Sequence, residues 1–310
     1  MSTARDLLIA RLGRVPAALP YQPPRVDRRF TMDGIVFERW RIAGPRGEIP
    51  AYFLAAETLR SRIPAIVAIH PHGRQFEVGK SLVAGLVGDG SRAYGLAAAK
   101  AGFAVLIPDL PGFEDRRPPL AARKGNYALQ GEAYERLLAM EALVTGATLQ
   151  GWILADLSAC VDALENDPRV DGGKVAAMGQ SLGGQETIFG MVFDRRFAAG
   201  ICSCGFSLVR LLVDRSISHN LALYVPGLLP DLDFDRLFAD IAPRPITVLA
   251  GRDDPIYPVE GVEVVERTAR AAYAAAGSPA SLRFEYFAGS HDLPADLLAK
   301  ALSWLADVLH

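Results

Sequence analysis

A serine between two glycines, in Gly179-Gln180-Ser181-Leu182-Gly183, is the strongest chemical signal in the chain. The apolar run 175–178 precedes it and indicates a buried strand, and a helical pattern follows over 185–193. On a sharp turn between a strand and a helix, the glycines leave room for neighbouring backbone and the hydroxyl of Ser181 projects into a cleft. The amide of Leu182 then lies at a helix N-terminus, where it can stabilise developing negative charge. The stretch predicts a nucleophilic serine with one oxyanion donor beside it.

A serine nucleophile needs a histidine base and a carboxylate that orients the imidazole. Among the five histidines, His291 follows the last predicted strand, and we expect it to face Ser181. The carboxylate is expected after an intermediate strand, in Gly251-Arg252-Asp253-Asp254-Pro255-Ile256-Tyr257-Pro258, where Asp254 has a glycine three residues before it and a proline four residues after it. The turn made by the flanking glycine and proline favours Asp254. Asp253 is the alternative, because adjacent side chains point different ways, and either residue could instead cap the following helix.

The second oxyanion donor is expected in the loop His70-Pro71-His72-Gly73-Arg74, after the apolar run 63–69. The amide of Gly73 or Arg74 would supply it, since a glycine lets the backbone approach the substrate. His70 and His72 could instead bind a metal, but no further ligand follows at a suitable spacing. No glycine-rich nucleotide motif opens a helix after a strand. We therefore expect no metal and no cofactor, and we place three polar side chains at the substrate pocket: His72, His219 and Gln180.

Apolar strands that alternate with helices must position these residues. A hairpin is predicted over 34–42 and 49–56. Further strands are predicted at 63–69, 103–107, 175–178, 199–204, 246–250 and 282–287, and helices at 94–101, 131–145, 151–165, 185–193, 259–276 and 293–309. Continuous apolar strands of this kind indicate a parallel sheet covered on both faces, with reactive groups where the strands end. We predict an α/β fold with a mostly parallel central sheet, helices on both faces and an antiparallel N-terminal hairpin.

Length and composition limit the domain organisation and the partners. Half of the 310 residues are apolar, which suits a single large domain over 31–310, preceded by a helical, proline-rich arm over 1–30. The net charge of −2 and the lack of basic runs disfavour nucleic acid and anionic membranes as partners. We recognise no signal peptide or membrane span, and three free cysteines favour a reducing, cytoplasmic compartment. The sequence is compatible with a homo-oligomer.

Together these segments resemble the α/β-hydrolase superfamily, and more narrowly its dienelactone-hydrolase-like and acetyl-xylan-esterase-like branch. The resemblance runs from about residue 60 to the last helix. Besides the stretches above it includes Gly79-Lys80-Ser81, Pro108-Asp109-Leu110-Pro111-Gly112, Ser218-His219-Asn220 and Ile241-Ala242-Pro243-Arg244-Pro245. It implies a triad of Ser181, Asp254 and His291, and an oxyanion hole formed by Leu182 and the loop at His72-Gly73. True dienelactone hydrolases use cysteine where this chain has serine, which favours ordinary esters as substrates.

These features lead to the hypothesis of a serine carboxylic-ester hydrolase that acts on short-chain acyl esters through an acyl-enzyme intermediate. Its partner would be a small-molecule ester, held in a pocket that we expect residues 111–130 and 205–230 to line. Two alternatives remain open. The same triad would serve a peptidase or amidase acting on small substrates, and the same fold could be a catalytically inactive binding protein.

Overall fold

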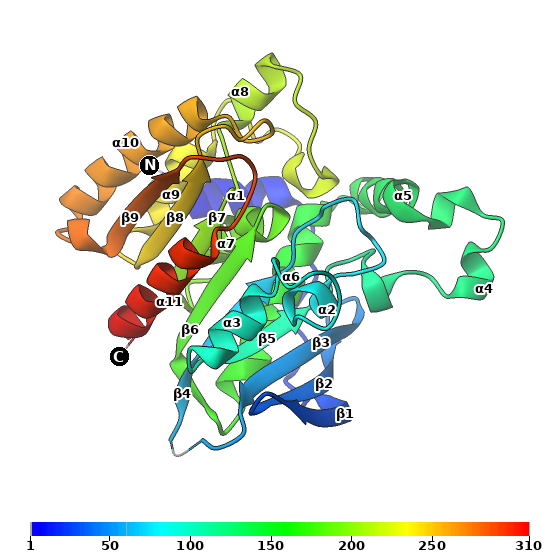
Figure 1. Ribbon diagram of the computed structural model, residues 1–310. Helices are drawn as coiled ribbons and strands as arrows, with labels where there is room; N and C mark the ends of the chain where they lie inside the picture. Colours follow the sequence, from blue (N-terminus) through cyan, green and yellow to red (C-terminus); the bar gives the residue numbers. More distant parts are fainter. Residues whose placement is uncertain (1, 60, 310) are drawn as a thin grey trace.

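The computed structural model describes residues 2–59 and 61–309, so the predicted boundaries at residues 1 and 310 lie outside the described residues (Figure 1). Its centre is a nine-stranded sheet in the order β1-β2-β3-β5-β4-β6-β7-β8-β9. The strands are β1 Arg25–Met32, β2 Ile35–Gly44, β3 Gly47–Ala56, β4 Ile63–Ile69, β5 Ala104–Pro108, β6 Val170–Gln180, β7 Phe197–Ser203, β8 Ile246–Gly251 and β9 Leu282–Phe287. Strands β1, β2, β3 and β5 pair antiparallel, and β5-β4-β6-β7-β8-β9 pair parallel.

Helices cover both faces of the sheet, as predicted (Figure 1). They are α1 Ala4–Leu12, α2 Lys80–Val83, α3 Tyr94–Lys100, α4 Leu120–Arg123, α5 Gly131–Val144, α6 Leu149–Glu165, α7 Leu182–Phe193, α8 Val209–Asp214, α9 Phe234–Ile241, α10 Val259–Ala275 and α11 Ala295–Leu309. The apolar residues of α3 and α11 form one core with one face of the strands. Those of α6, α7, α9 and α10 form a second core on the other face. The sheet is therefore buried between two layers, which accounts for its nearly continuous apolar strands.

The predicted N-terminal hairpin is present, and the sheet extends one strand beyond it. Strands β2 and β3 pair over their whole length, from Ile35 with Ala56 to Gly44 with Gly47. Strand β1 then pairs with β2 at the sheet edge, and most of its side chains are exposed. Its charged sequence protects that edge from pairing with other chains and also conceals the strand from a search for apolar patterns. The sheet thus begins inside the segment predicted to be an arm.

Helix α1 lies outside the sheet and supports the region around Ser181. Its buried residues are Ala4, Leu8 and Leu12, and the helix packs against α7 and α9. The Arg5 side chain donates to the Phe193 carbonyl at the end of α7, at 2.9 Å, and its amide donates to Asp240. The N-terminal segment therefore braces the helix that follows Ser181.

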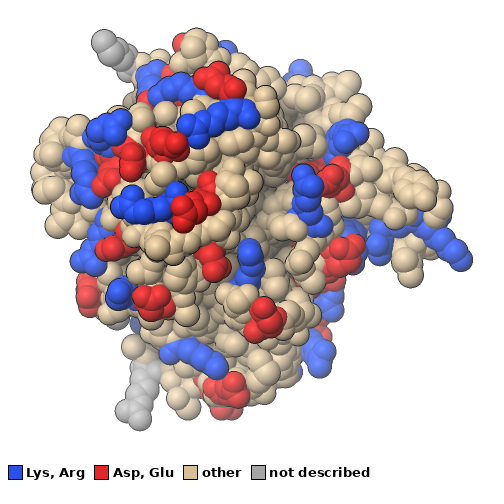
Figure 2. Space-filling model, turned by 45° about the horizontal axis from the view of Figure 1, so that its top comes forward, with Lys and Arg blue, Asp and Glu red and all other residues tan. Residues whose placement is uncertain are grey.

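The surface carries basic and acidic side chains in close alternation, as Figure 2 shows for one face. Within the described residues no single helix is long and apolar enough to cross a membrane. One pair, α5 with α6, reaches that length and composition only when taken together, and it is bent by 94° between the two helices.

Candidate active site

Ser181 occupies a strained turn between β6 and α7. Its backbone has φ 60° and ψ −122°, a region that costs a non-glycine residue on the order of 1–3 kcal/mol. The turn is fixed at both ends, because the Ser181 amide donates to the Ser203 carbonyl at 3.0 Å and its carbonyl accepts from the Gln185 amide at 2.9 Å. The neighbouring strand and the first turn of the helix therefore hold the serine in this conformation.

The glycines around Ser181 are required by close backbone contacts. A Cβ atom on Gly183 would lie 1.9 Å from the Ile69 carbonyl oxygen, and one on Gly179 would lie 2.3 Å from the Gly183 carbonyl carbon. Both separations are far inside van der Waals contact, so no other residue fits without moving backbone. The first contact also brings the end of β4, and the loop that follows it, against the serine turn.

Asp254 and His291 come together at the ends of β8 and β9. The His291 Nδ1 lies 2.7 Å from Asp254 Oδ2, and Asp254 Oδ1 accepts from the amides of Ile256 and Tyr257, each at 3.0 Å. Burial alone would raise the pKa of Asp254, but the hydrogen bond from His291 and those two amides outweigh it and hold the pKa below its ordinary value. Asp254 is therefore an anion that receives the Nδ1 proton.

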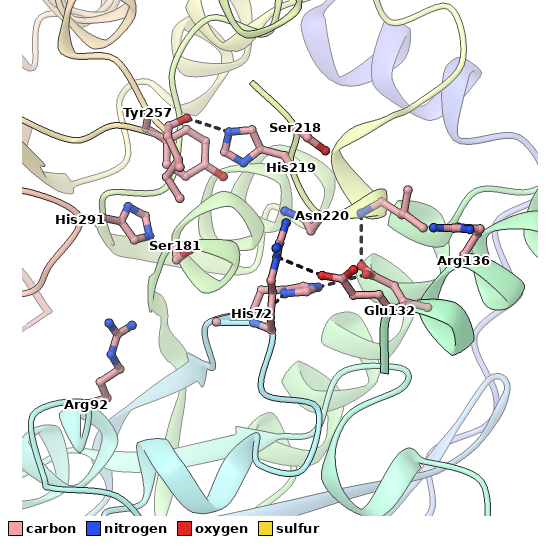
Figure 3. Close-up of a pocket in the computed structure, with 15 residues that line it drawn as sticks. His72, Arg92, Glu132, Arg136, Ser181, Ser218, His219, Asn220, Tyr257 and His291 are labelled. Atoms are coloured by element: carbon pink, nitrogen blue, oxygen red, sulfur yellow. Dashed lines mark hydrogen bonds and ion pairs between the residues drawn. The ribbon is translucent and has the colours of Figure 1, made fainter. Parts of the chain in front are cut away.

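The second ring nitrogen of His291, Nε2, is free to accept a proton. Nε2 is buried and has no hydrogen-bond partner among the described residues. Ser181 and His291 line the same cavity, and Figure 3 shows the imidazole beside the serine. Because Nδ1 carries the proton, the neutral ring presents Nε2 as an acceptor. Asp253, the alternative carboxylate, is exposed, and only its amide is bonded, to the Gly289 carbonyl.

The loops that carry Asp254 and His291 are packed directly on one another. A Cβ atom on Gly251 would lie 2.1 Å from the Ser290 carbonyl oxygen, so only glycine allows this approach. The Arg252 amide donates to the Phe287 carbonyl at 3.0 Å, and Ser203 Oγ donates to the Asp292 carbonyl at 3.0 Å. These contacts fix the imidazole relative to β7 and thus to the serine turn.

The loop after β4 brings backbone amides to the cavity. Gly73 and Arg74 both have positive φ, at 51° and 57°, and the Arg74 amide donates to His72 Nδ1 at 3.1 Å. Arg74, one of the two predicted oxyanion donors of this loop, thus already has an acceptor for its amide. The described residues offer no acceptor to the amides of Gly73 and Leu182. Gly73 and Leu182 are therefore the pair of amides that an oxyanion could bind.

The two histidines of this loop are engaged individually rather than as a pair. His70 is fully buried; its Nε2 accepts from the Leu110 amide at 3.0 Å and its Nδ1 faces the Pro71 carbonyl at 2.9 Å. Burial lowers the pKa of His70 to about 4, so the ring is neutral. His72 places Nε2 3.1 Å from Glu135, on α5, which ties the oxyanion loop to that helix.

The cavity has a volume of about 390 Å³, and the described residues of its walls come from seven separate stretches of the chain. The lining residues are His72, Gly73, Arg74, Arg92, Glu132, Glu135, Arg136, Ser181, Ser218, His219, Asn220, Leu221, Ile256, Tyr257 and His291. His219 lies on the wall as predicted for a pocket residue. Its ring stacks on Tyr257 with centroids 4.3 Å apart, and its Nε2 lies 2.7 Å from the Ile256 carbonyl.

Two expectations about the cavity walls are wrong. None of the described lining residues lies within 111–130; that wall comes instead from α5, through Glu132, Glu135 and Arg136. The 111–130 stretch turns inward at its start, where Glu114 bonds Lys80. Gln180 is not a lining residue either: its side chain is buried, and its Oε1 accepts from Arg92 Nη1 at 2.7 Å.

A buried polar network lies beneath the cavity. Asn220 Nδ2 donates to Gln185 Oε1 at 3.0 Å, and Gln185 Nε2 donates to Glu186 Oε1 at 3.0 Å. Gln150 donates to the other oxygen of Glu186. Burial raises the pKa of Glu186 to about 8, against the opposing effect of the hydrogen bonds from Gln150 and Gln185. The network supports Asn220 from below, and its carboxyl group is neutral near pH 7.

Two groups of side chains in the described residues have donor atoms close enough to hold a metal ion. One is Asp254 and His291 with Cys204; the other is Asp109, Glu114 and Asp115. In the second group the Lys80 ammonium occupies the centre, 2.7, 2.6 and 2.8 Å from the three carboxylates. The carboxylates outweigh burial and raise the pKa of Lys80, so a permanent cation fills that place. In the first group Asp254 already binds the imidazole.

Comparison with known proteins agrees with this architecture. The chain resembles a putative acetyl xylan esterase from Bacteroides fragilis NCTC 9343 (TM-score 0.72, 16% identity, 94% of this chain and 77% of that one). It also resembles a glucuronoyl esterase from Solibacter usitatus (0.70, 14%, 98% and 91%) and a putative dienelactone hydrolase from Klebsiella pneumoniae (0.58, 17%, 88% and 99%). The fold is that of the α/β hydrolases.

Two comparisons of the sequence also match hydrolases, and one of them is with a protein of similar length. The model of the prolyl oligopeptidase family matches residues 146–222, which include the serine turn. The Bacillus subtilis (strain 168) protein named "Putative hydrolase YtaP" is 28% identical over 304 residues, which cover 97% of each chain. These relatives and neighbours are named as hydrolases, esterases or peptidases, in agreement with the expectation of a hydrolase.

Sequence reasoning did not find every residue of the cavity. Arg92 and the α5 residues Glu132, Glu135 and Arg136 lie in segments without a recognisable motif, and only the fold brings them to Ser181. Tyr257 and Asn220 were within segments that carried the family resemblance, but nothing in their spacing indicated a place in the cavity.

Proposed function

We propose that this protein is a serine carboxylic-ester hydrolase that cleaves short-chain acyl esters through an acyl-enzyme intermediate. The observation that carries the proposal is the state of His291. Asp254 fixes its Nδ1 at 2.7 Å, and its buried Nε2 is unpartnered among the described residues in the cavity that Ser181 enters. An oriented imidazole with a ring nitrogen free to take the hydroxyl proton is what a serine nucleophile requires.

In the proposed reaction, Ser181 Oγ attacks the ester carbonyl carbon while its proton passes to His291 Nε2. The carbonyl oxygen becomes an oxyanion that accepts hydrogen bonds from the Leu182 and Gly73 amides. Collapse of the intermediate breaks the bond to the alcohol, which leaves with the proton from His291. Water then attacks the acyl carbon and gives a proton to His291. His291 passes that proton to Ser181 Oγ as the bond to the acyl group breaks and the acid leaves. Asp254 stabilises the imidazolium in both steps.

The size of the cavity supports small substrates. A volume of about 390 Å³ is at the lower end of ligand sites, and no separate lid covers it within the described residues. The proposal needs no cofactor. Three buried cysteines without disulfides support a reducing, cytoplasmic setting, which cell fractionation would test. The only partner that we propose is a small-molecule ester. Light scattering would determine whether the chain forms a homo-oligomer.

The test is hydrolysis of 4-nitrophenyl acetate and butanoate by the wild-type protein and by Ser181→Ala. We expect the variant to lose activity by on the order of 10⁶-fold, because the nucleophile and its base act as a unit. The matched control is Ser303→Ala on the exposed face of α11, which should keep full activity. Unchanged hydrolysis by a folded Ser181→Ala protein would contradict the proposal.

A peptidase or amidase is the second candidate, because the matching family model is that of the prolyl oligopeptidases. The same residues can cleave an amide when the leaving amine is protonated by His291. Paired 4-nitrophenyl esters and 4-nitroanilides with the same acyl group separate the two activities. The ester proposal predicts the larger excess of catalysed over uncatalysed rate for the esters, and a larger excess for the anilides would favour the peptidase.

A further inference from the structure

Some of the charged side chains that line the cavity have a partner of opposite charge, and others do not. Arg74 lies 3.0 Å from Glu132, and Glu135 lies 3.1 Å from His72. In the part of the chain that the structure describes, Arg92 and Arg136 have no carboxylate partner. Two cations therefore face the cavity without an anion of the protein to pair with.

Arg92 is the one that lies on the Ser181 side. Figure 3 shows its guanidinium on the same side as Ser181 and His291, whereas Arg136 lies beyond Glu132 on the opposite wall. Its anchor is Gln180, the residue directly before the serine, whose Oε1 accepts from Arg92 Nη1 at 2.7 Å. The side chain is thus tied to the strand that carries the nucleophile.

The hydrogen bond to Gln180 leaves the positive charge of Arg92 available. Gln180 is 1% exposed and neutral, so it fixes the guanidinium without cancelling its charge. Asp89, the nearby acidic residue, bonds Ser91 through both the Ser91 amide and its hydroxyl instead of pairing with Arg92. A guanidinium has five donors in a planar fork, and a single bond to Gln180 leaves a face that can bind a carboxylate with two parallel hydrogen bonds.

We propose that Arg92 is a specificity-determining residue that binds a carboxylate carried by the substrate, so that the enzyme prefers anionic esters to neutral esters of the same size. The inference rests on the proposed function of Ser181. Gln180 acts as a positioning residue that orients Arg92. The carboxylate could belong to the acyl half or to the alcohol half of the ester, and both halves are tested.

The experiment compares two matched pairs of esters. For the acyl half, the pair is 4-nitrophenyl hydrogen glutarate and 4-nitrophenyl pentanoate. For the alcohol half, it is 4-acetoxybenzoate and 4-acetoxybenzamide. The measured quantity is the kcat/KM of each variant relative to wild type, so the intrinsic reactivity of each ester cancels.

For Arg92→Gln we expect the kcat/KM for the anionic ester of one pair to fall on the order of 10- to 100-fold, the usual effect of losing a charged hydrogen bond. The neutral ester should change by less than about threefold. Arg92→Lys should recover part of the loss, because it keeps the charge but not the fork. Gln180→Glu should also remove the preference, since a carboxylate there would neutralise Arg92. Arg267→Gln is the control and should behave as wild type, because Arg267 is exposed on α10 and has no ion-pair partner among the described residues.

Two results would overturn the inference while the ester-hydrolase proposal stands. One is an equal loss for anionic and neutral esters, which would mean that Arg92 acts on every ester. The other is no loss for either. If wild type cleaved none of the four esters, the proposed function itself would fail. Calorimetric binding of 4-nitrophenyl hydrogen glutarate and 4-acetoxybenzoate to the uncleaving Ser181→Ala protein, with and without Arg92→Gln, then tests Arg92 alone: binding lost on removing Arg92 supports it, and binding unchanged or absent contradicts it.

Discussion

The Lys80 cluster and the Ser181–Asp254–His291 group use similar side chains at the ends of neighbouring strands, but only one of them is saturated. Lys80 is 1% exposed and contacts three carboxylates, of which Asp109 and Glu114 also accept from nearby amides and Asp115 accepts from Arg39. Asp254 is equally well bonded, yet the imidazole that it holds ends in an unpartnered buried nitrogen.

The difference separates a structural site from a reactive one. The buried Lys80 ammonium contacts three carboxylates and has no donor left to bind a substrate, so the contribution of the cluster is to fix the loop after β5 against α2. An unsatisfied buried nitrogen costs free energy of folding, on the order of 1–3 kcal/mol, and in His291 this nitrogen belongs to a side chain that lines the same cavity as Ser181. We therefore expect substitutions in the first cluster to change stability and those in the second to change activity.

The largest expected effect is that of His291→Ala on activity. Without the base, ester hydrolysis should fall on the order of 10⁶-fold, as Ser181→Ala does, while the free energy of unfolding stays within about 1 kcal/mol of wild type. Steady-state kinetics and urea unfolding measure the two quantities. A large loss of stability with little loss of activity would remove the distinction between the two sites.

Asp254→Asn should be the next largest. The amide cannot stabilise the imidazolium or fix the Nδ1 proton, so we expect kcat to fall on the order of 10³- to 10⁴-fold. Asp253→Asn is the matched control, since its carboxylate is exposed and has no bonded partner. Equal losses in the two variants would show that the orienting carboxylate is not specific to Asp254.

Lys80→Met should have the opposite effect, a large loss of stability with a small loss of activity. It leaves the buried Asp109 and the half-buried Glu114 without their cation, while the exposed Asp115 keeps its ion pair with Arg39, and the free energy of unfolding should fall by about 3–5 kcal/mol. The activity of the molecules that remain folded should change far less than in His291→Ala. If urea unfolding showed no loss of stability, the cluster would not have the structural role assigned to it.

Glu186 sharpens the comparison, because it is a buried carboxyl with neutral partners only. Burial raises its pKa to about 8, well above that of an unfolded glutamate. Between about pH 4.5 and 8 the folded state therefore binds one more proton than the unfolded state, and the unfolding free energy falls as pH rises, by at most about 1.4 kcal/mol per pH unit. Glu186→Gln should remove this contribution. Urea unfolding at pH 5 and pH 8 would contradict it if the wild-type protein and the variant lost stability in parallel.

The strands β4, β6 and β8 were predictable because each contains a run that is buried on both faces, whereas β9 is an edge strand and only partly buried. The runs 63–69 and 282–287 coincide with β4 and β9, and the ends of β6 and β8 place Ser181 and Asp254 after apolar segments. Chain order and strand ends together were enough to indicate which residues could meet. Strand β1 escaped prediction for the opposite reason, since an exposed edge strand with charged residues has no apolar pattern.

The cavity walls could not be predicted, because they depend on packing between distant segments. Glu135 lies close to His72 only because of the course that α5 takes in the fold. Arg92 contacts Gln180, which is 88 residues away in the sequence. The acceptor of the Arg74 amide, His72 Nδ1, depends on the backbone conformation of the loop, which residue types alone do not determine. The sequence indicated the chemistry of the site, whereas the features proposed to select a substrate required the fold.

The most direct test of the central claim is covalent labelling with a fluorophosphonate, followed by peptide mass spectrometry. We expect a single adduct on Ser181 in the wild-type protein, rapid labelling in Asp253→Asn, and labelling slowed by orders of magnitude in His291→Ala. A folded wild-type protein that leaves Ser181 unmodified, or equal labelling rates with and without His291, would contradict it.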